Sequence, residues 1–185
     1  MASQSHREEK EVLRRSSRLV AAATAFAAVA VLAVASTPSG VLAGSLVPFH
    51  LTVSETFTAA PCGPSSRCIT AVGSGEATHL GAVSEHATVV VDTNPADAQG
   101  GCAPETRTTT LTAANGDTIT MSGTGWSCPT GDAHDDYVIT GGTGRFQGAS
   151  GSGSEVNSHT FTGPGVGVAS VTYDGTISSV GSLDN

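Results

Sequence analysis

Apolar and polar residues alternate along much of the chain after residue 44. In the stretch PFHLTVSETF, one face of this pattern carries Phe49, Leu51, Val53, Glu55 and Phe57. Near the other end, a similar alternation places Ala169, Val171, Tyr173 and Ile177 on one face. A period of two is typical of half-buried β-strands, and the many Thr and Gly residues disfavour helices. The pattern therefore predicts an all-β domain.

Turn signals divide the intervening sequence into short segments. We predict strands over residues 69–80, 82–92, 106–114, 117–124, 135–140, 146–155 and 158–162. Asn115-Gly116 predicts a two-residue hairpin, and Pro/Gly-rich loops are expected over residues 93–105, 124–135 and 162–167. Eight or nine short strands with regular turns indicate a barrel or a sandwich, and periodicity alone does not choose between them.

The stretch ITGGTGRFQGAS, residues 139–150, is similar to a dinucleotide-binding turn. Such a turn must open a helix whose amide groups hold the phosphates. The glycine- and serine-rich residues that follow are poor helix formers, and Gln147 occupies the position of the third glycine. We therefore interpret Gly141, Gly142, Thr143 and Gly144 as a tight turn between two strands, with Phe146 anchored in the core.

The first 43 residues are expected to be a signal peptide. A polar, arginine-containing segment precedes an apolar run over residues 19–35, and Val41-Leu42-Ala43 fits a cleavage site after Ala43. The alternative is a membrane anchor, because about 17 apolar residues approach a minimal span. Cleavage would leave residues 44–185 as one secreted domain.

The remaining chain is strongly acidic. Its basic residues are Arg67, Arg107 and Arg145, opposed by thirteen carboxylates. This balance disfavours a nucleic-acid partner and an anionic membrane surface, since both attract basic proteins.

Four cysteines lie in this part of the chain, and in an exported protein an even number indicates disulfides. Three pairings are open. We favour Cys62–Cys68, which flank a turn-like segment, together with Cys102–Cys128. Their spacings lack the close pairs of zinc sites, and no metal site is expected.

The string ITGGTGRFQGASGSG resembles the GGTGxFxxAxG motif of dirigent proteins and the related turn of allene oxide cyclases. GSGEATHLG, LTAANGDTITMSGTG and YDGTIS follow the order of elements in bacterial exported members of that superfamily. The resemblance implies an eight-stranded antiparallel, calycin-like β-barrel that holds an apolar molecule. It also implies cofactor-free ring closure, and a trimer, with a monomer as the alternative. It transfers Gly141, Gly142, Thr143, Gly144 and Phe146 as structural residues only.

Periodicity supplies separate catalytic candidates: Glu55, Glu85, Tyr137 and Arg107. Glu55 and Glu85 share faces with apolar residues, and a carboxyl group inside a barrel can act as a general acid or base. Tyr137 is in phase with Ile139 and could donate a hydrogen bond to a ligand. The alternative is that these carboxylates reach solvent at strand ends or pair with Arg107 or Arg145.

Two functions follow as expectations. The first is a secreted barrel that binds a small apolar or aromatic molecule and acts as a cofactor-free isomerase or cyclase. The second is a non-catalytic secreted binding or structural protein that keeps only the scaffold.

Overall fold

Eight antiparallel strands form a closed barrel in which each strand pairs with its sequence neighbours and β8 pairs with β1. The computed structural model describes residues 45–94 and 98–178, so the predicted signal peptide and its cleavage site lie outside the described residues. The strands are β1 (Leu46–Gly63), β2 (Ser66–Ala77), β3 (Gly81–Asp92), β4 (Ala103–Ala113), β5 (Thr118–Ser127), β6 (Asp132–Gly142), β7 (Gly151–Gly163) and β8 (Val166–Ser178). This closed sheet resolves the choice between barrel and sandwich.

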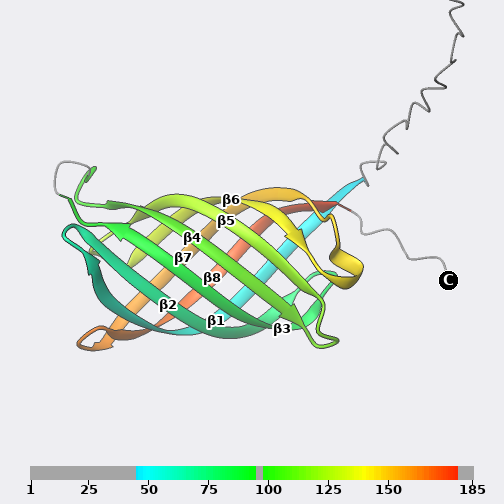
Figure 1. Ribbon diagram of the computed structural model, residues 1–185, viewed down its shortest axis with the longest axis horizontal. Helices are drawn as coiled ribbons and strands as arrows, with labels where there is room; N and C mark the ends of the chain where they lie inside the picture. The colour runs from blue at the N-terminus through cyan, green and yellow to red at the C-terminus, as the bar shows by residue number, and fades with distance from the viewer. Residues whose placement is uncertain (1–44, 95–97, 179–185) are drawn as a thin grey trace, which may run out of the picture. The chain divides into compact units, whose positions relative to one another are not determined.

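The barrel has two unlike ends (Figure 1). At one end, called here the terminal end, β1 begins beside the end of β8, because Leu46 pairs with Ser178. The connections β2–β3, β4–β5 and β6–β7 lie at the same end. The connections β1–β2, β3–β4, β5–β6 and β7–β8 lie at the opposite end, called the disulfide end. No helix among the described residues is long and apolar enough to cross a membrane.

Some predicted element boundaries are wrong. The predicted strands 146–155 and 158–162 form the single strand β7, which begins only at Gly151. The predicted loop over residues 124–135 shrinks to residues 128–131, because β5 and β6 each extend further. Asn115-Gly116 lies in a four-residue connection, residues 114–117, in which the Ala113 N–H donates to the Asp117 carbonyl and Gly116 adopts a positive φ. Cross-strand pairing extends strands through residues whose local sequence suggests loops.

The GGTG stretch forms a corner at the terminal end. After β6 ends at Gly142, a 3₁₀ turn over Gly144–Phe146 carries Phe146 into the core, where it is fully buried. Gly144 has a φ of 57°, and a Cβ there would lie 1.8 Å from an oxygen of Asp117. The stretch is therefore a structural corner followed by a strand, which contradicts a nucleotide-binding loop.

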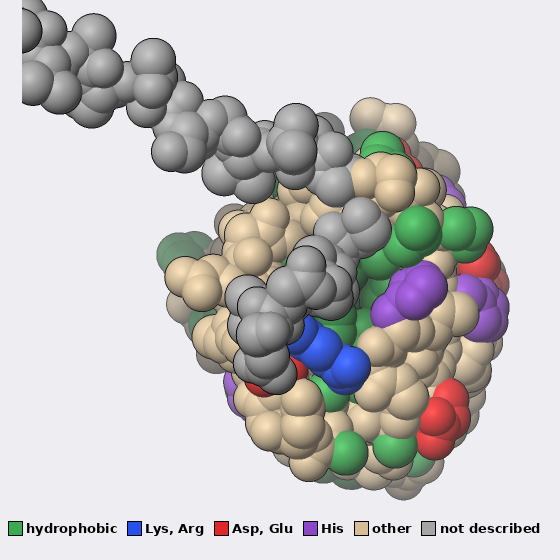
Figure 2. Space-filling model, turned by 90° about the vertical axis from the view of Figure 1, so that its right-hand side faces the viewer, with side chains coloured by type: hydrophobic (Ala, Val, Ile, Leu, Met, Phe, Trp, Pro, Cys, Tyr) green, Lys and Arg blue, Asp and Glu red, His purple; other side chains and the backbone are tan. Residues whose placement is uncertain are grey.

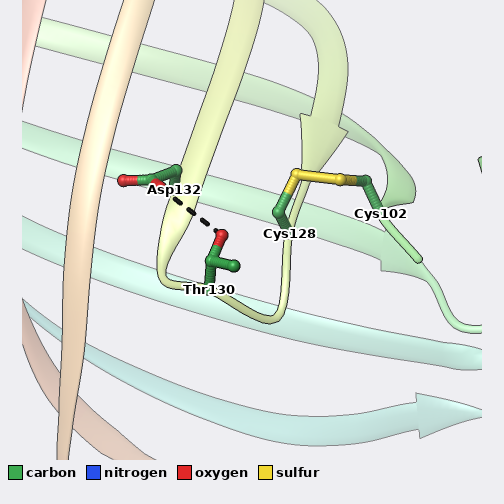
Figure 3. Close-up of a disulfide and its surroundings, with 4 residues drawn as sticks. All are labelled: Cys102, Cys128, Thr130 and Asp132. Carbon is green, nitrogen blue, oxygen red and sulfur yellow. Dashed lines mark hydrogen bonds between the residues drawn. A yellow bond between two sulfur atoms is a disulfide. The ribbon is translucent and has the colours of Figure 1, made fainter. Parts of the chain in front are cut away.

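Two disulfides brace the disulfide end. Cys62–Cys68 joins β1 to β2, and Cys102–Cys128 joins the start of β4 to the connection after β5 (Figure 3). Beside the second bond, the Thr130 hydroxyl donates to Asp132 at 3.4 Å within the β5–β6 turn. These are the two favoured pairings, and such bonds persist in oxidising compartments.

The terminal half of the interior is apolar. Figure 2 looks onto this end, where hydrophobic side chains lie in a hollow between a basic side chain and histidine side chains. The largest fully buried apolar side chains near this end are Phe49, Leu51, Leu111, Ile119, Met121, Phe146 and Ile177. Burial of such side chains contributes about 1.5–3 kcal/mol each. They close the terminal end and leave the disulfide half for polar residues.

Glycines on β7 and β8 make room for one aromatic side chain. A Cβ at Gly153 would lie 2.0 Å from the Asp174 carbonyl oxygen and 2.7 Å from the Tyr137 hydroxyl. A Cβ at Gly175 would meet the same hydroxyl at 2.7 Å. The glycines of the GSGS segment, residues 151–154, therefore belong to a crowded barrel wall.

We predict that Gly153→Ala lowers the free energy of unfolding by about 1–3 kcal/mol, since the added methyl overlaps backbone and side-chain atoms. Gly123→Ala is the matched control, because a Cβ at this wall position meets its neighbours at 3.5 Å or more. Urea unfolding of both variants provides the comparison. Equal losses would show that the close approach does not limit this wall.

Candidate functional site

Arg107 on β4 organises the polar half of the interior. Its Nη2 donates to Glu55 on β1 and to Glu85 on β3, the latter at 3.1 Å. Its Nη1 lies 3.2 Å from Glu155 on β7. The Nε donates to the Thr109 hydroxyl at 3.1 Å. Every nitrogen of the guanidinium thus contacts a protein oxygen, and all these side chains are buried.

Tyr173 on β8 completes this cluster. Its hydroxyl donates to Glu85 at 2.6 Å, and the Arg107 guanidinium lies 6.0 Å from the centre of its ring. Burial raises the pKa of Tyr173 well above its ordinary value, so the phenol keeps its proton. The cluster consequently joins five strands through one cation.

Glu105 on β4 and Asp135 on β6 form a second buried group. Their side chains share a hydrogen bond across β5, where the intervening position is Gly125. A Cβ at Gly125 would lie 2.3 Å from Asp135 Oδ1, so the carboxylate occupies the space of the missing side chain. Among the described residues, the ion pairs of Arg107 reach Glu55, Glu85 and Glu155 but neither of these two.

Five buried carboxyl groups therefore face one arginine. One cation does not offset the burial of so many carboxyl groups, and the pKa values of several of them are raised. Burial raises the pKa of Glu55 to about 7, an effect that Arg107 partly opposes. Burial and the nearby Asp135 raise the pKa of Glu105 to about 8. Burial likewise raises the pKa of Glu155 to about 8 and that of Asp135 above its usual range. Protonated and ionised forms are both accessible near neutral pH.

A cavity of about 40 Å³ opens beside these groups at the disulfide end. This volume holds about three water molecules. Its polar lining comes from Glu55, Glu105, Arg107, Ser127, Asn157 and His159. The aromatic rings of Phe57, His159 and Phe161 lie edge to face with centroids 5.2–6.0 Å apart and line its apolar side.

An outer cleft of about 480 Å³ adjoins this cavity. The two share Ile69, Ser127, His159 and Phe161. The cleft also contacts the Cys128 end of a disulfide and the β5–β6 turn. Its volume lies within the range of small-molecule sites, about 300–1,000 Å³.

The structure brings three of the four predicted catalytic residues together. Glu55, Glu85 and Arg107 meet in one ion-pair cluster, which corresponds to the alternative of pairing with Arg107 rather than reaching solvent. Glu55 and Arg107 line the cavity, whereas Glu85 and Tyr137 do not. Tyr137 is buried against Tyr173, and within residues 45–94 and 98–178 its hydroxyl has no hydrogen-bond partner. Burial raises the pKa of Tyr137 to about 12.

Sequence reasoning missed several members of the site: Glu105, Thr109, Asp135, Glu155, Asn157 and Tyr173. The sequence pattern places Glu105 in a loop and Asp135 at the first position of a strand. Asp135 shares the parity of Tyr137 and Ile139, a signal that could have placed it inside. The predicted alternative partner Arg145 lies outside, paired with Asp117 at 3.4 Å.

No family model and no curated protein matches the chain. Among solved structures, the pterocarpan synthase dirigent protein GePTS1 is similar with a TM-score of 0.42 and 13% identity, covering 76% of this chain and 93% of that one. The pterocarpan synthase dirigent protein PsPTS1 is similar with a TM-score of 0.41 and 15% identity, covering 72% and 94%. The chain is thus similar in structure to dirigent proteins at low sequence identity.

The raised carboxyl pKa values predict how stability depends on pH. The folded state binds protons more tightly than the unfolded state, so stability should fall as pH rises from about 4.5 to about 8. Thermal unfolding across this range measures the effect. Glu105→Gln should flatten the curve, while substitution of the exposed Glu76 by Gln should leave it unchanged. Stability that rises over the same range would contradict the assignment.

Proposed function

We propose that this protein is a secreted barrel that binds a small molecule with an aromatic or apolar body at its disulfide end. The buried carboxyl groups beneath that site then transfer protons and so guide an isomerisation or cyclisation without a cofactor. The observation that carries the proposal is the junction of an aromatic-lined cleft with buried carboxyl groups that titrate near neutral pH.

The two volumes suit different parts of one ligand. The outer cleft has room for an aromatic or apolar body, against Ile69 and Phe161. The inner cavity has room only for a small polar group, which would meet Glu55, Glu105 and Asn157. An apolar site with a few convergent polar groups is the usual form of a small-molecule site.

The chemistry follows from the protonation states. With pKa values of about 7 and about 8, Glu55 and Glu105 can each hold or accept a proton at neutral pH. A protonated carboxyl can donate to a ligand oxygen while an ionised one accepts a proton from another ligand atom. Arg107 would stabilise negative charge that develops on the ligand. Ring closure and isomerisation of this kind change no oxidation state.

The non-catalytic alternative rests on a specific observation as well. The inner cavity is only about 40 Å³, and the nitrogens of Arg107 are already engaged by protein oxygens. In that case the barrel binds the ligand in the outer cleft and the interior charges serve the fold alone.

Ligand capture tests the proposal. We expect the natively exported protein to co-purify with, or bind from an aromatic compound library, molecules that native mass spectrometry detects. Phe161→Ser should weaken this binding about tenfold or more, because it removes apolar surface at the mouth. Val90→Ser provides the matched control, since Val90 is similarly exposed but does not line the cleft.

Equal binding by both variants would place the ligand elsewhere and overturn the site. If binding is retained but Glu55→Gln and Glu105→Gln convert every bound compound as the parent does, the catalytic part of the proposal fails. In that outcome the non-catalytic binding function stands.

A further inference from the structure

The inner cavity presents hydrogen-bond acceptors that have no donor. Asn157 is 8% exposed and lines the cavity, and in the part of the chain that the structure describes its Oδ1 has no hydrogen-bond partner. Asp135 is 1% exposed and does not line the cavity itself, but it adjoins Glu105, which does, and its Oδ1 has no hydrogen-bond partner among the described residues. Buried acceptors without a partner cost free energy, so a ligand that donates hydrogen bonds here would recover it.

The charged groups around the cavity also favour a ligand that carries a positive charge. Arg107 forms ion pairs with Glu55, Glu85 and Glu155. Among the described residues it forms none with Glu105 or Asp135, although its charge partly opposes the rise in the pKa of both. His159 does not supply a cation, because burial lowers its pKa and favours the neutral imidazole at neutral pH. The one buried cation among the described residues, Arg107, lines the cavity but is already bonded to protein oxygens, so the five buried carboxyl groups outnumber it.

The aromatic side of the cavity also suits a cation. Phe57, His159 and Phe161 pack edge to face around its mouth. Aromatic faces attract organic ammonium groups by about 0.5–2 kcal/mol. Among the described residues, no three acidic, histidine or cysteine side chains are arranged to hold a metal ion.

From this arrangement we propose that the ligand carries a primary ammonium group. This inference rests on the proposed function and names the chemical class of its ligand. The ammonium head enters the inner cavity and donates to Asn157 and to Glu105, whose carboxyl group adjoins that of Asp135, and the apolar body lies in the outer cleft.

Proton release should accompany binding. Glu105 has a pKa of about 8 in the free protein, and an adjacent ammonium group favours its ionised form. Affinity for an amine that stays protonated should therefore rise between about pH 6 and about pH 8. The other charged groups that face this region are Glu55 on β1, Arg67 on β2, Arg107 on β4, Asp132 and Asp135 on β6, and Glu155 and His159 on β7.

Isothermal titration with three probes of similar shape tests the inference: benzylamine, benzyl alcohol and benzoate. We expect benzylamine to bind about tenfold or more tightly than benzyl alcohol, a difference of about 1.4 kcal/mol. Benzoate should bind most weakly. Titrations in buffers with different ionisation enthalpies should reveal the released proton.

Glu105→Gln keeps the size of the side chain and removes its charge. It should abolish the preference for the amine, so that benzylamine and benzyl alcohol bind the variant with similar affinity. Asp135→Asn is a second variant with the same expectation, and Glu76→Gln on the outer surface is the control. Loss of the preference only in the interior variants supports the inference.

Two results would overturn it, in distinguishable ways. If benzyl alcohol binds as tightly as benzylamine, or benzoate binds more tightly, the ammonium assignment is wrong while small-molecule binding at this end stands. If none of the three probes binds, both the ammonium assignment and the proposed function fail.

Discussion

The structure depends on one guanidinium enclosed in a closed sheet. Arg107 draws Glu55, Glu85 and Glu155 inward from three other strands, and Tyr173 bonds to the same cluster. Charged groups are rarely buried unless they are paired, because desolvation is costly. Burial by itself would lower the pKa of Arg107, yet the surrounding carboxyl groups and Tyr173 raise it well above its ordinary value. The buried guanidinium and the buried carboxylates thus stabilise one another, because each compensates the charge of the other.

The rest of the barrel separates this cluster from solvent at the terminal end. Phe49, Leu111 and Phe146 belong to an apolar layer that closes the terminal end, and the corner at Gly142–Phe146 delivers the last of these side chains. The disulfide end is braced by covalent bonds rather than by a deep apolar core. The cavity, the cleft and the buried Glu55 and Glu105 therefore lie at the same end of the barrel.

Much of the fold could be predicted from the sequence, since the alternation in β1 reports directly which side chains face inward. Glu55, Glu85 and Arg107 could be identified because each shares a face with apolar residues. Glu105 could not be identified because it lies near a strand end that only cross-strand pairing reveals, whereas the parity of Asp135 with Tyr137 does indicate an inward position. The proximity of Glu105 and Asp135 depends on Gly125 on the strand between them, a contact no local pattern encodes. Similarly, the shared partner Arg107 brings together strands far apart in the sequence.

Compensation of buried charge by Arg107 is the central claim, and unfolding of Arg107→Met at two pH values tests it most directly. At about pH 8.5, above the pKa values of Glu55 and Glu155, the variant should lose about 3–5 kcal/mol, because ionised carboxylates lose their partner. At about pH 5, where protonated carboxyl groups need no cation, the loss should be much smaller. The same loss at both pH values would contradict charge compensation as the organising interaction.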